Sequence, residues 1–151
     1  MFSLTYLAWI RPPLNCLKLN IDGTRITSSG KIRAGGVLRD HSVNLIFGYQ
    51  INLRIGEILD AEAWSLLFGL KLVAKYHCYD LEVKSDSAVL VQLMQKDSVA
   101  FLPLGSLLVA CSSLMSKMQN VKLSHIFREC NMTVDSLAKN SITHESWIGY
   151  F

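Results

Sequence analysis

The fold is decided by the stretch LKLNIDG at residues 17–23, which alternates apolar and polar side chains and ends on glycine. Alternation with a period of two residues is typical of a β-strand that turns one face toward a core, so we expect a strand that Gly23 ends. Apolar runs at residues 34–39 and 45–52 predict two further strands, joined by a turn at 40–44. Because short loops connect these three strands, we expect them to pair antiparallel.

Beyond residue 56 the sequence changes from the period of a strand to that of a helix. Residues 57–76 are rich in Leu, Ala and Lys and predict a long, largely buried helix. The remaining elements expected, in chain order, are a strand at 81–85, a helix at 87–95, a helix from Pro103 to about Met118, a strand at 121–127 and a helix at 133–140. Helical crossovers place the later strands parallel to the first, so the chain predicts an α/β fold with a mixed sheet.

The composition is that of one globular domain. The chain has 151 residues, half of them hydrophobic, which is enough to bury a sizeable core. We expect an N-terminal arm over residues 1–16, the folded domain over 17–141 and a C-terminal tail over 142–151. The net charge of +3 permits nucleic-acid binding but does not by itself argue for it.

The expected location is intracellular, with nucleus and cytoplasm left open. The apolar start at residues 1–10 is too short to span a bilayer, so we expect no association with a membrane. The four cysteines have no metal-ligand spacing, and we interpret them as reduced thiols of a reducing compartment: Cys16, Cys78, Cys111 and Cys130.

Four carboxylates lie in apolar surroundings, where a charge is costly unless it is paired or bound to a metal. Asp22 and Asp86 stand at the ends of the first and fourth predicted strands, Glu62 lies between two alanines of the long helix, and Asp135 lies in the last helix. Parallel crossovers bring the two strand ends side by side, and a carboxylate from a helix packed on the sheet can join them. Such a cluster favours hard divalent cations, Mg²⁺ first and Mn²⁺ next. Two ions about 4 Å apart would activate a water and stabilise the leaving oxygen of a phosphoryl displacement.

Each of these acids also has an ordinary structural explanation. Asp22 precedes a glycine and could begin a turn. Glu62 could pair with a lysine on its own helix, Asp86 could cap the following helix, and Asp135 could interact with a helix dipole. The combination of all four in one order favours the functional interpretation.

The order of the motifs resembles type 1 ribonuclease H. The matching motifs are NIDGT at 20–24, AGGVLRD at 34–40, AEA at 61–63, SDS at 85–87, HIFRE at 125–129, and Asn131 followed by DSLA at 135–138. More narrowly, they resemble the ribonuclease H-like domain that is abundant in plants and related to that of non-LTR retroelements. The lead-in Trp9, Pro12 and KLN at 18–20 fits that subgroup, and the resemblance extends from Trp9 to Asn140.

The resemblance implies a fold and an activity. The fold is a five-stranded mixed sheet of strand order 3-2-1-4-5, flanked by helices. The activity is endonucleolytic hydrolysis of the RNA strand of RNA–DNA hybrids with two Mg²⁺ ions, for which Mn²⁺ can substitute. The family's catalytic metal ligands map onto Asp22, Glu62, Asp86 and Asp135. Asp22 would bridge both ions, Glu62 and Asp86 would complete one site, and Asp135 the other.

The resemblance also implies the contacts with nucleic acid. We expect them at Gly23, Thr24, Glu62 and Asn131. Since Gly23 has no side chain, the backbone around it and Thr24 could approach the RNA strand. Glu62 could accept a hydrogen bond from a 2′-hydroxyl, the group that distinguishes RNA from DNA. We expect the chain to act as a monomer.

Three departures from the family pattern leave a second function open. The loop at 128–131 is short and lacks the histidine of many active relatives, Val43 stands where glycine is usual, and residues 95–103 carry only one basic side chain, Lys96. The alternative is a catalytically weak or inactive nucleic-acid-binding module with the same fold. An integrase- or resolvase-like nuclease fits the Asp-Gly, Ala-Glu and Asp-Ser motifs less well, and a flavodoxin-like ligand binder is disfavoured because no phosphate-cradling glycine loop is present.

Overall fold

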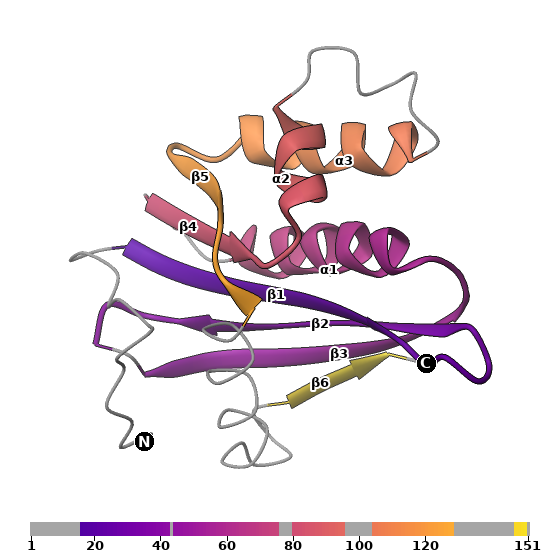
Figure 1. The fold of residues 1–151 in the computed structure, drawn as a ribbon. Coiled ribbons are helices and arrows are strands. Elements are labelled where there is room, and N and C mark those ends of the chain that lie inside the picture. The colour runs from indigo at the N-terminus through magenta and orange to yellow at the C-terminus, as the bar shows by residue number, and fades with distance from the viewer. Residues whose placement is uncertain (1–15, 43, 76–79, 96–103, 129–146, 151) are drawn as a thin grey trace.

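A computed structural model describes residues 16–42, 44–75, 80–95, 104–128 and 147–150 of the chain (Figure 1). Val43, Asn131, Asp135 and the predicted helix at 133–140 therefore lie outside the described residues. The elements in chain order are β1 (Cys16–Arg25), β2 (Lys31–Arg39), β3 (Leu45–Ile55), α1 (Ile58–Val73), β4 (Asp80–Ser85), α2 (Ala88–Met94), α3 (Gly105–Ser116), β5 (Val121–His125) and β6 (Trp147–Tyr150).

The strands form one mixed sheet of order β5-β4-β1-β2-β3-β6. Strands β1, β2 and β3 pair antiparallel, β4 pairs parallel with β1, and β5 pairs parallel with β4. The predicted strand order 3-2-1-4-5 is thus confirmed, as are the antiparallel start and the parallel crossovers. The expectation that Gly23 ends the first strand is wrong: β1 continues to Arg25, because Gly23 pairs with Ala34 of β2 and the ladder runs on to Ile32.

A sixth strand extends the sheet beyond this prediction. Strand β6 comes from the segment assigned above to a C-terminal tail, and it pairs parallel with β3 over residues 48–51. It has four residues, and such a short run carries little periodicity of its own. Its strand conformation depends on pairing with a segment about 100 residues earlier in the chain, and single-sequence patterns do not reveal such pairing.

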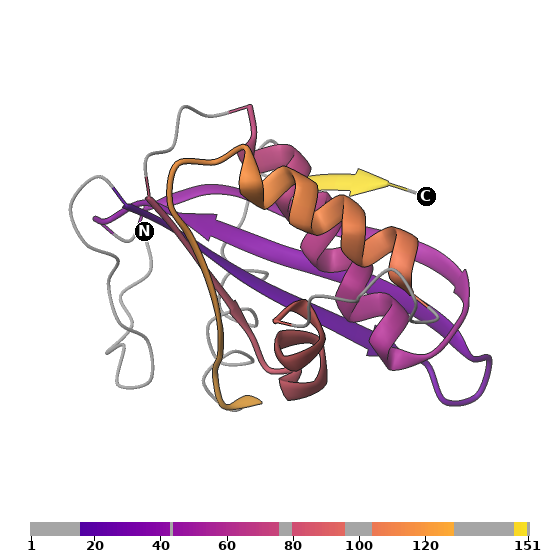
Figure 2. The same ribbon diagram turned by 90° about the horizontal axis from the view of Figure 1, so that it is seen from above.

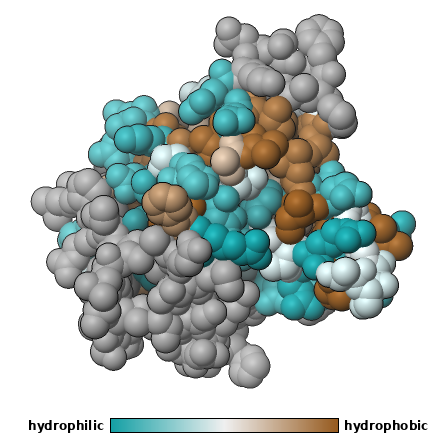
Figure 3. All heavy atoms as spheres, viewed as in Figure 1, coloured by the Kyte–Doolittle hydropathy of each residue, from teal (hydrophilic) through white to brown (hydrophobic). Residues whose placement is uncertain are grey.

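The helices form a layer on one face of the sheet (Figures 1 and 2). Helix α1 packs on β1 and β2, and α3 packs in turn against α1. The core between them contains Leu19 and Ile21 from β1 and Leu66 and Leu70 from α1, none of which is exposed to solvent. In Figure 3 hydrophobic residues gather over the helical layer, whereas the middle of that view is mostly hydrophilic. Within the described residues, no helix has both the length and the hydrophobicity that a membrane span requires.

Tyr49 fixes α1 on the sheet. Its side chain is fully buried, and its hydroxyl donates a hydrogen bond to the backbone carbonyl of Ser65 in α1. Gly36 and Gly69 leave room for the ring, since a Cβ on Gly69 would lie 2.6 Å from the tyrosine hydroxyl and one on Gly36 would overlap it. Because Ser65 lies one turn after Glu62, this crossing also sets the position of Glu62 relative to the strands.

Candidate active site

Three of the four predicted acids converge at one place in the structure. Asp22 of β1, Glu62 of α1 and Asp86 after β4 each offer a carboxylate oxygen, and these oxygens lie within 4.8 Å of one another. The parallel pairing of β1 with β4 ends at Ile21 and Ser85, and the residue that follows each of these two in the chain is an acid of the cluster. Asp22 therefore lies where β1 loses β4 as a neighbour, three residues before β1 itself ends. The predicted approach of these carboxylates is confirmed.

Gly23 allows Glu62 to reach the strands. A Cβ at this position would lie 2.7 Å from the backbone carbon of Ala61 and 2.7 Å from the backbone nitrogen of Glu62. No side chain larger than hydrogen fits such an approach of strand to helix. From the sequence we expected the missing side chain of Gly23 to let an RNA strand approach the backbone. The structure shows that α1 occupies the space where a Gly23 side chain would lie. Contacts of the Gly23 and Thr24 backbone with nucleic acid stay a prediction.

Glu62 is a buried acid whose ionised form would be poorly compensated. The residue is 4% exposed, and its Oε2 atom has no hydrogen-bond partner among the described residues. Burial, followed by repulsion from Asp22 and Asp86, raises the pKa of Glu62 to about 9, against the opposing effects of a Gly23 backbone hydrogen bond and the Arg128 charge. A buried carboxylate oxygen without a partner, beside two further carboxylates, is chemically suited to a hard divalent cation. The residues present therefore fit the metal that the resemblance implies.

Asp86 is the second perturbed acid of the cluster. Burial raises its pKa, while the charges of Arg128 and His125 and a hydrogen bond with Glu62 act in the opposite direction. Asp86 does not cap the helix that follows, because Ser87 is the N-cap of α2 and accepts a hydrogen bond from the Leu90 backbone at 3.2 Å. Nor does Asp22 begin a turn, since β1 runs through it. The ordinary structural explanations for these two acids are thus wrong.

Two basic residues near the cluster were not singled out as site residues from the sequence. Arg128 and His125 both act on the charge of Asp86, and Arg128 also acts on Glu62. Arg128 and His125 come close to Asp86 because the backbone N–H of Ile126 donates a hydrogen bond to the carbonyl of Ser85 at 2.9 Å. This hydrogen bond holds the chain after β5 against the end of β4. The available signal was the motif HIFRE at 125–129, although nothing in its spacing places the motif beside an acid about 40 residues earlier.

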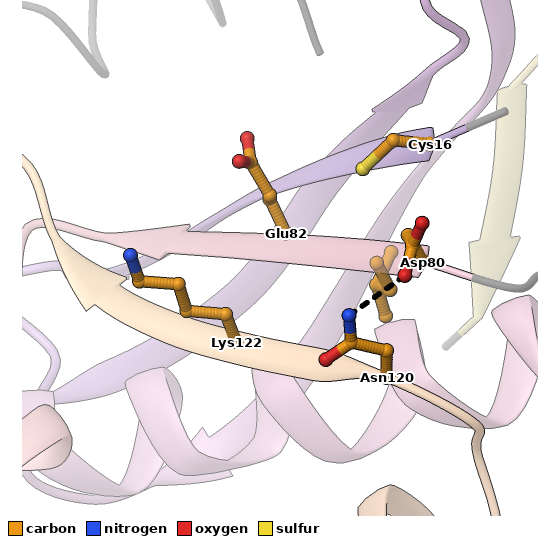
Figure 4. A pocket seen from close by; sticks show the side chains of 6 residues that line it. Cys16, Asp80, Glu82, Asn120 and Lys122 are labelled. Atoms are coloured by element: carbon orange, nitrogen blue, oxygen red, sulfur yellow. Dashed lines mark hydrogen bonds between the residues drawn. The ribbon is translucent and has the colours of Figure 1, made fainter. Parts of the chain in front are cut away.

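A separate pocket lies at the N-terminal ends of β1, β4 and β5, away from the carboxylate cluster (Figure 4). It has a volume of about 240 Å³ and is lined by Cys16, Asp80, Leu81, Glu82, Asn120 and Lys122. Within it, the Asn120 side-chain amide donates to an Asp80 carboxylate oxygen at 2.8 Å. Asp80 begins β4, whereas Asp86 follows the last residue of that strand, so the pocket is distinct from the carboxylate cluster.

Comparison of the sequence with known proteins identifies a family and a relative of this chain. The family model described as "Reverse transcriptase-like" matches residues 20–141, well over half of the chain. The chain is 30% identical over 132 residues to the Arabidopsis thaliana protein named "Putative ribonuclease H protein At1g65750", an alignment that covers 87% of this chain and 21% of that protein. The chain thus spans about a fifth of the length of this relative.

Solved structures share the fold. RNase H1 of the archaeon Halobacterium salinarum superposes with a TM-score of 0.69 at 18% identity, covering 81% of this chain and 93% of that one. LC11-RNase H1, isolated from compost and solved in complex with an RNA/DNA hybrid, gives a TM-score of 0.69 at 22% identity, covering 80% and 92%. With the sheet order, the carboxylate cluster and the family match in agreement, the chain belongs to the reverse transcriptase-like family and is a ribonuclease H-like domain.

Proposed function

We propose that this chain is an endonuclease that hydrolyses the RNA strand of RNA–DNA hybrids by a two-metal mechanism. The observation that carries the proposal is the convergence of Asp22, Glu62 and Asp86 on a fold shared with ribonucleases H, with a buried oxygen of Glu62 lacking a partner among the described residues. The hybrid-bound structure of LC11-RNase H1 supports the choice of substrate. We propose that the chain acts as a monomer.

Asp22, Glu62 and Asp86 would hold the metal, and Asp135 completes the proposed ligand set from outside the described residues. Mg²⁺, or Mn²⁺ in its place, would supply Lewis acidity that activates a water and stabilises the leaving oxygen. Glu62 would have to release its proton to serve as a metal ligand, because a carboxyl with a pKa of about 9 is protonated near neutral pH. Asp22 lies in β1, Asp86 directly follows the neighbouring strand β4, and Glu62 lies in α1. The proposed ligands are therefore held by three different elements.

The chain's other residues near the cluster would bind the substrate. Arg128 brings a positive charge toward the acids and is suited to a phosphate of the RNA strand. Glu62 can accept a hydrogen bond from a 2′-hydroxyl, which would select RNA over DNA. Gly23 and Thr24, together with Asn131 from outside the described residues, complete the proposed contacts with the hybrid.

A second candidate function is nucleic-acid binding with little or no turnover. The observation that favours it is that the sequence has no histidine between Arg128 and Asp135, where many active relatives have one. The net charge of +3 is also modest for a chain that binds nucleic acid on its own. The two candidates differ in one measurable property, which is cleavage.

The test is cleavage of a labelled RNA–DNA hybrid in Mg²⁺ and in Mn²⁺, beside single-stranded RNA, duplex RNA and duplex DNA. We expect cutting confined to the RNA strand of the hybrid and a loss of at least about 100-fold in Asp22→Asn, which removes a ligand proposed to serve both ions. The matched control is Asp80→Asn, an acid at the far end of β4 that should cut like the unchanged chain. Cleavage retained in Asp22→Asn contradicts the mechanism, and binding without cleavage by the folded protein favours the second candidate.

A further inference from the structure

The segment after β5 exposes an aromatic ring beside the carboxylate cluster. Phe127 is 72% exposed and is the one aromatic among the large apolar side chains that the described part of the chain leaves exposed. Single exposed apolar residues are common on protein surfaces, so the exposure alone indicates no role. The position of this ring relative to the site is the informative feature.

Both neighbours of Phe127 connect it to the cluster. On one side, Ile126 donates its backbone N–H to the Ser85 carbonyl at 2.9 Å, immediately before Asp86 in the chain. On the other side, the charge of Arg128 acts on both Asp86 and Glu62. The backbone of Phe127 is therefore close to the end of β4, where Asp86 follows Ser85 into the carboxylate cluster.

The ring is also oriented by a neighbouring side chain. His125 and Phe127 lie edge to face, with ring centroids 6.1 Å apart and an interplanar angle of 77°. This is a favoured arrangement of two aromatic rings, and both residues belong to the segment that is held against β4. The apolar ring of Phe127 offers surface to a sugar, and the neighbouring Arg128 offers positive charge to the adjoining phosphate, which is the alternation that a nucleic-acid backbone presents.

Resting on the function proposed above, we propose that Phe127 is a substrate contact that packs on the ribose next to the scissile phosphate, while Arg128 binds the adjoining phosphate. Ribose is favoured over a base because the bases of a hybrid are paired and stacked inside the duplex, whereas its sugars line the accessible groove. The contact is apolar, so its contribution to affinity should not depend on salt. Arg128 should show the opposite behaviour, because a phosphate contact releases counterions.

The experiment measures hybrid binding by fluorescence anisotropy over a range of salt concentrations. All variants carry Asp22→Asn, which prevents cleavage during the measurement. Phe127→Ala should weaken binding by about fivefold at every salt concentration, the effect of removing roughly 40 Å² of apolar contact. Phe127→Tyr should restore the affinity. Arg128→Gln should instead reduce the slope of log K against log salt by about one.

The matched control is Val109→Ala, which truncates an exposed apolar residue on α3, a helix that packs against α1. It should bind like the parent, and thermal unfolding should show that every variant is folded. Unchanged affinity in Phe127→Ala, with the parent binding the hybrid, overturns this inference and leaves the proposed function standing. A larger loss on single-stranded RNA than on the hybrid overturns the assignment to ribose in favour of an unstacked base. A folded parent that binds no hybrid overturns the proposed function, and this inference with it.

Discussion

Replacing Glu62 by glutamine should make the metal-free protein more stable at alkaline pH. In the folded chain the pKa of Glu62 is raised to about 9 from 4.5, mainly by burial. The unfolded chain therefore gives up the Glu62 proton at a lower pH than the folded chain does. The stability associated with this group is fully present below pH 4.5 and is lost as the pH rises through about 9. The free energy of unfolding should fall across that window when no metal is present.

The size of the fall in unfolding free energy follows from the one proton that Glu62 keeps in the folded state. Between these two pKa values the folded state holds about one more proton than the unfolded state, which corresponds to about 1.4 kcal/mol per pH unit. Because Glu62 is only 4% exposed, solvent screens this contribution little. From pH 6 to pH 8 the empty site should lose roughly 2–3 kcal/mol. Glutamine has a similar shape without the titrating proton, so Glu62→Gln should remove most of this loss.

The assay is urea unfolding, followed by circular dichroism in the presence of EDTA at pH 6 and pH 8. The quantity compared is the change in unfolding free energy between the two pH values, in the parent and in Glu62→Gln. The control is Glu82→Gln, a part-buried acid of β4 outside the cluster, which should lose as much stability as the parent. Mg²⁺ at about 100 times its Kd should restore roughly 2–3 kcal/mol to the parent at pH 8. An equal loss in the parent and in Glu62→Gln would refute the reasoning, because Glu62 would then not be a buried neutral acid.

Two further substitutions test how the fold positions Glu62. Gly23→Ala places a Cβ 2.7 Å from backbone atoms of Ala61 and Glu62, so it should cost roughly 1–3 kcal/mol of stability and reduce hybrid cleavage. Unchanged thermal unfolding and cleavage would show that β1 and α1 do not touch there. Tyr49→Phe removes the hydrogen bond to the Ser65 carbonyl but keeps the ring, so it should cost about 1 kcal/mol by urea unfolding and leave cleavage nearly unchanged. A cleavage defect as large as that of Gly23→Ala would contradict the expectation that packing of the buried ring keeps α1 in place once the hydrogen bond is lost.

The sequence predicted those parts of the site that depend on local pattern. The alternation at residues 17–23 placed Asp22 on a strand, and the apolar helix around Glu62 identified an acid without an evident partner. The predicted parallel crossover then placed Asp86 beside Asp22, which the register of β1 with β4 confirms. Each of these inferences used only the period of a single element and the helical connections that make the later strands parallel to the first.

The parts that the sequence did not predict depend on contacts between elements distant in the chain. Nothing in the order of residues shows that Gly23 faces α1, since Asp-Gly is also a common turn pair. The order of residues likewise does not show that the charge of Arg128 lowers the pKa of Asp86. Arg128 comes close to Asp86 because Ile126 is hydrogen-bonded to Ser85. Strand β6 is a third case, because its conformation depends on β3. Sequence pattern fixes which face of an element is buried, but not which residue of another element lies opposite.

These contacts also explain how the fold holds three acids close together. Repulsion would drive the carboxylates apart if any one of them could move, but each is held by a backbone contact of its own element. Gly23 brings β1 against α1, Tyr49 holds α1 on the sheet, and Ile126 ties β5 to the end of β4. The remaining repulsion is relieved by keeping the Glu62 proton, since its pKa is raised to about 9. Metal binding would then exchange that proton for a cation within a nearly fixed frame, so the affinity for Mg²⁺ should rise with pH while the fold stays the same.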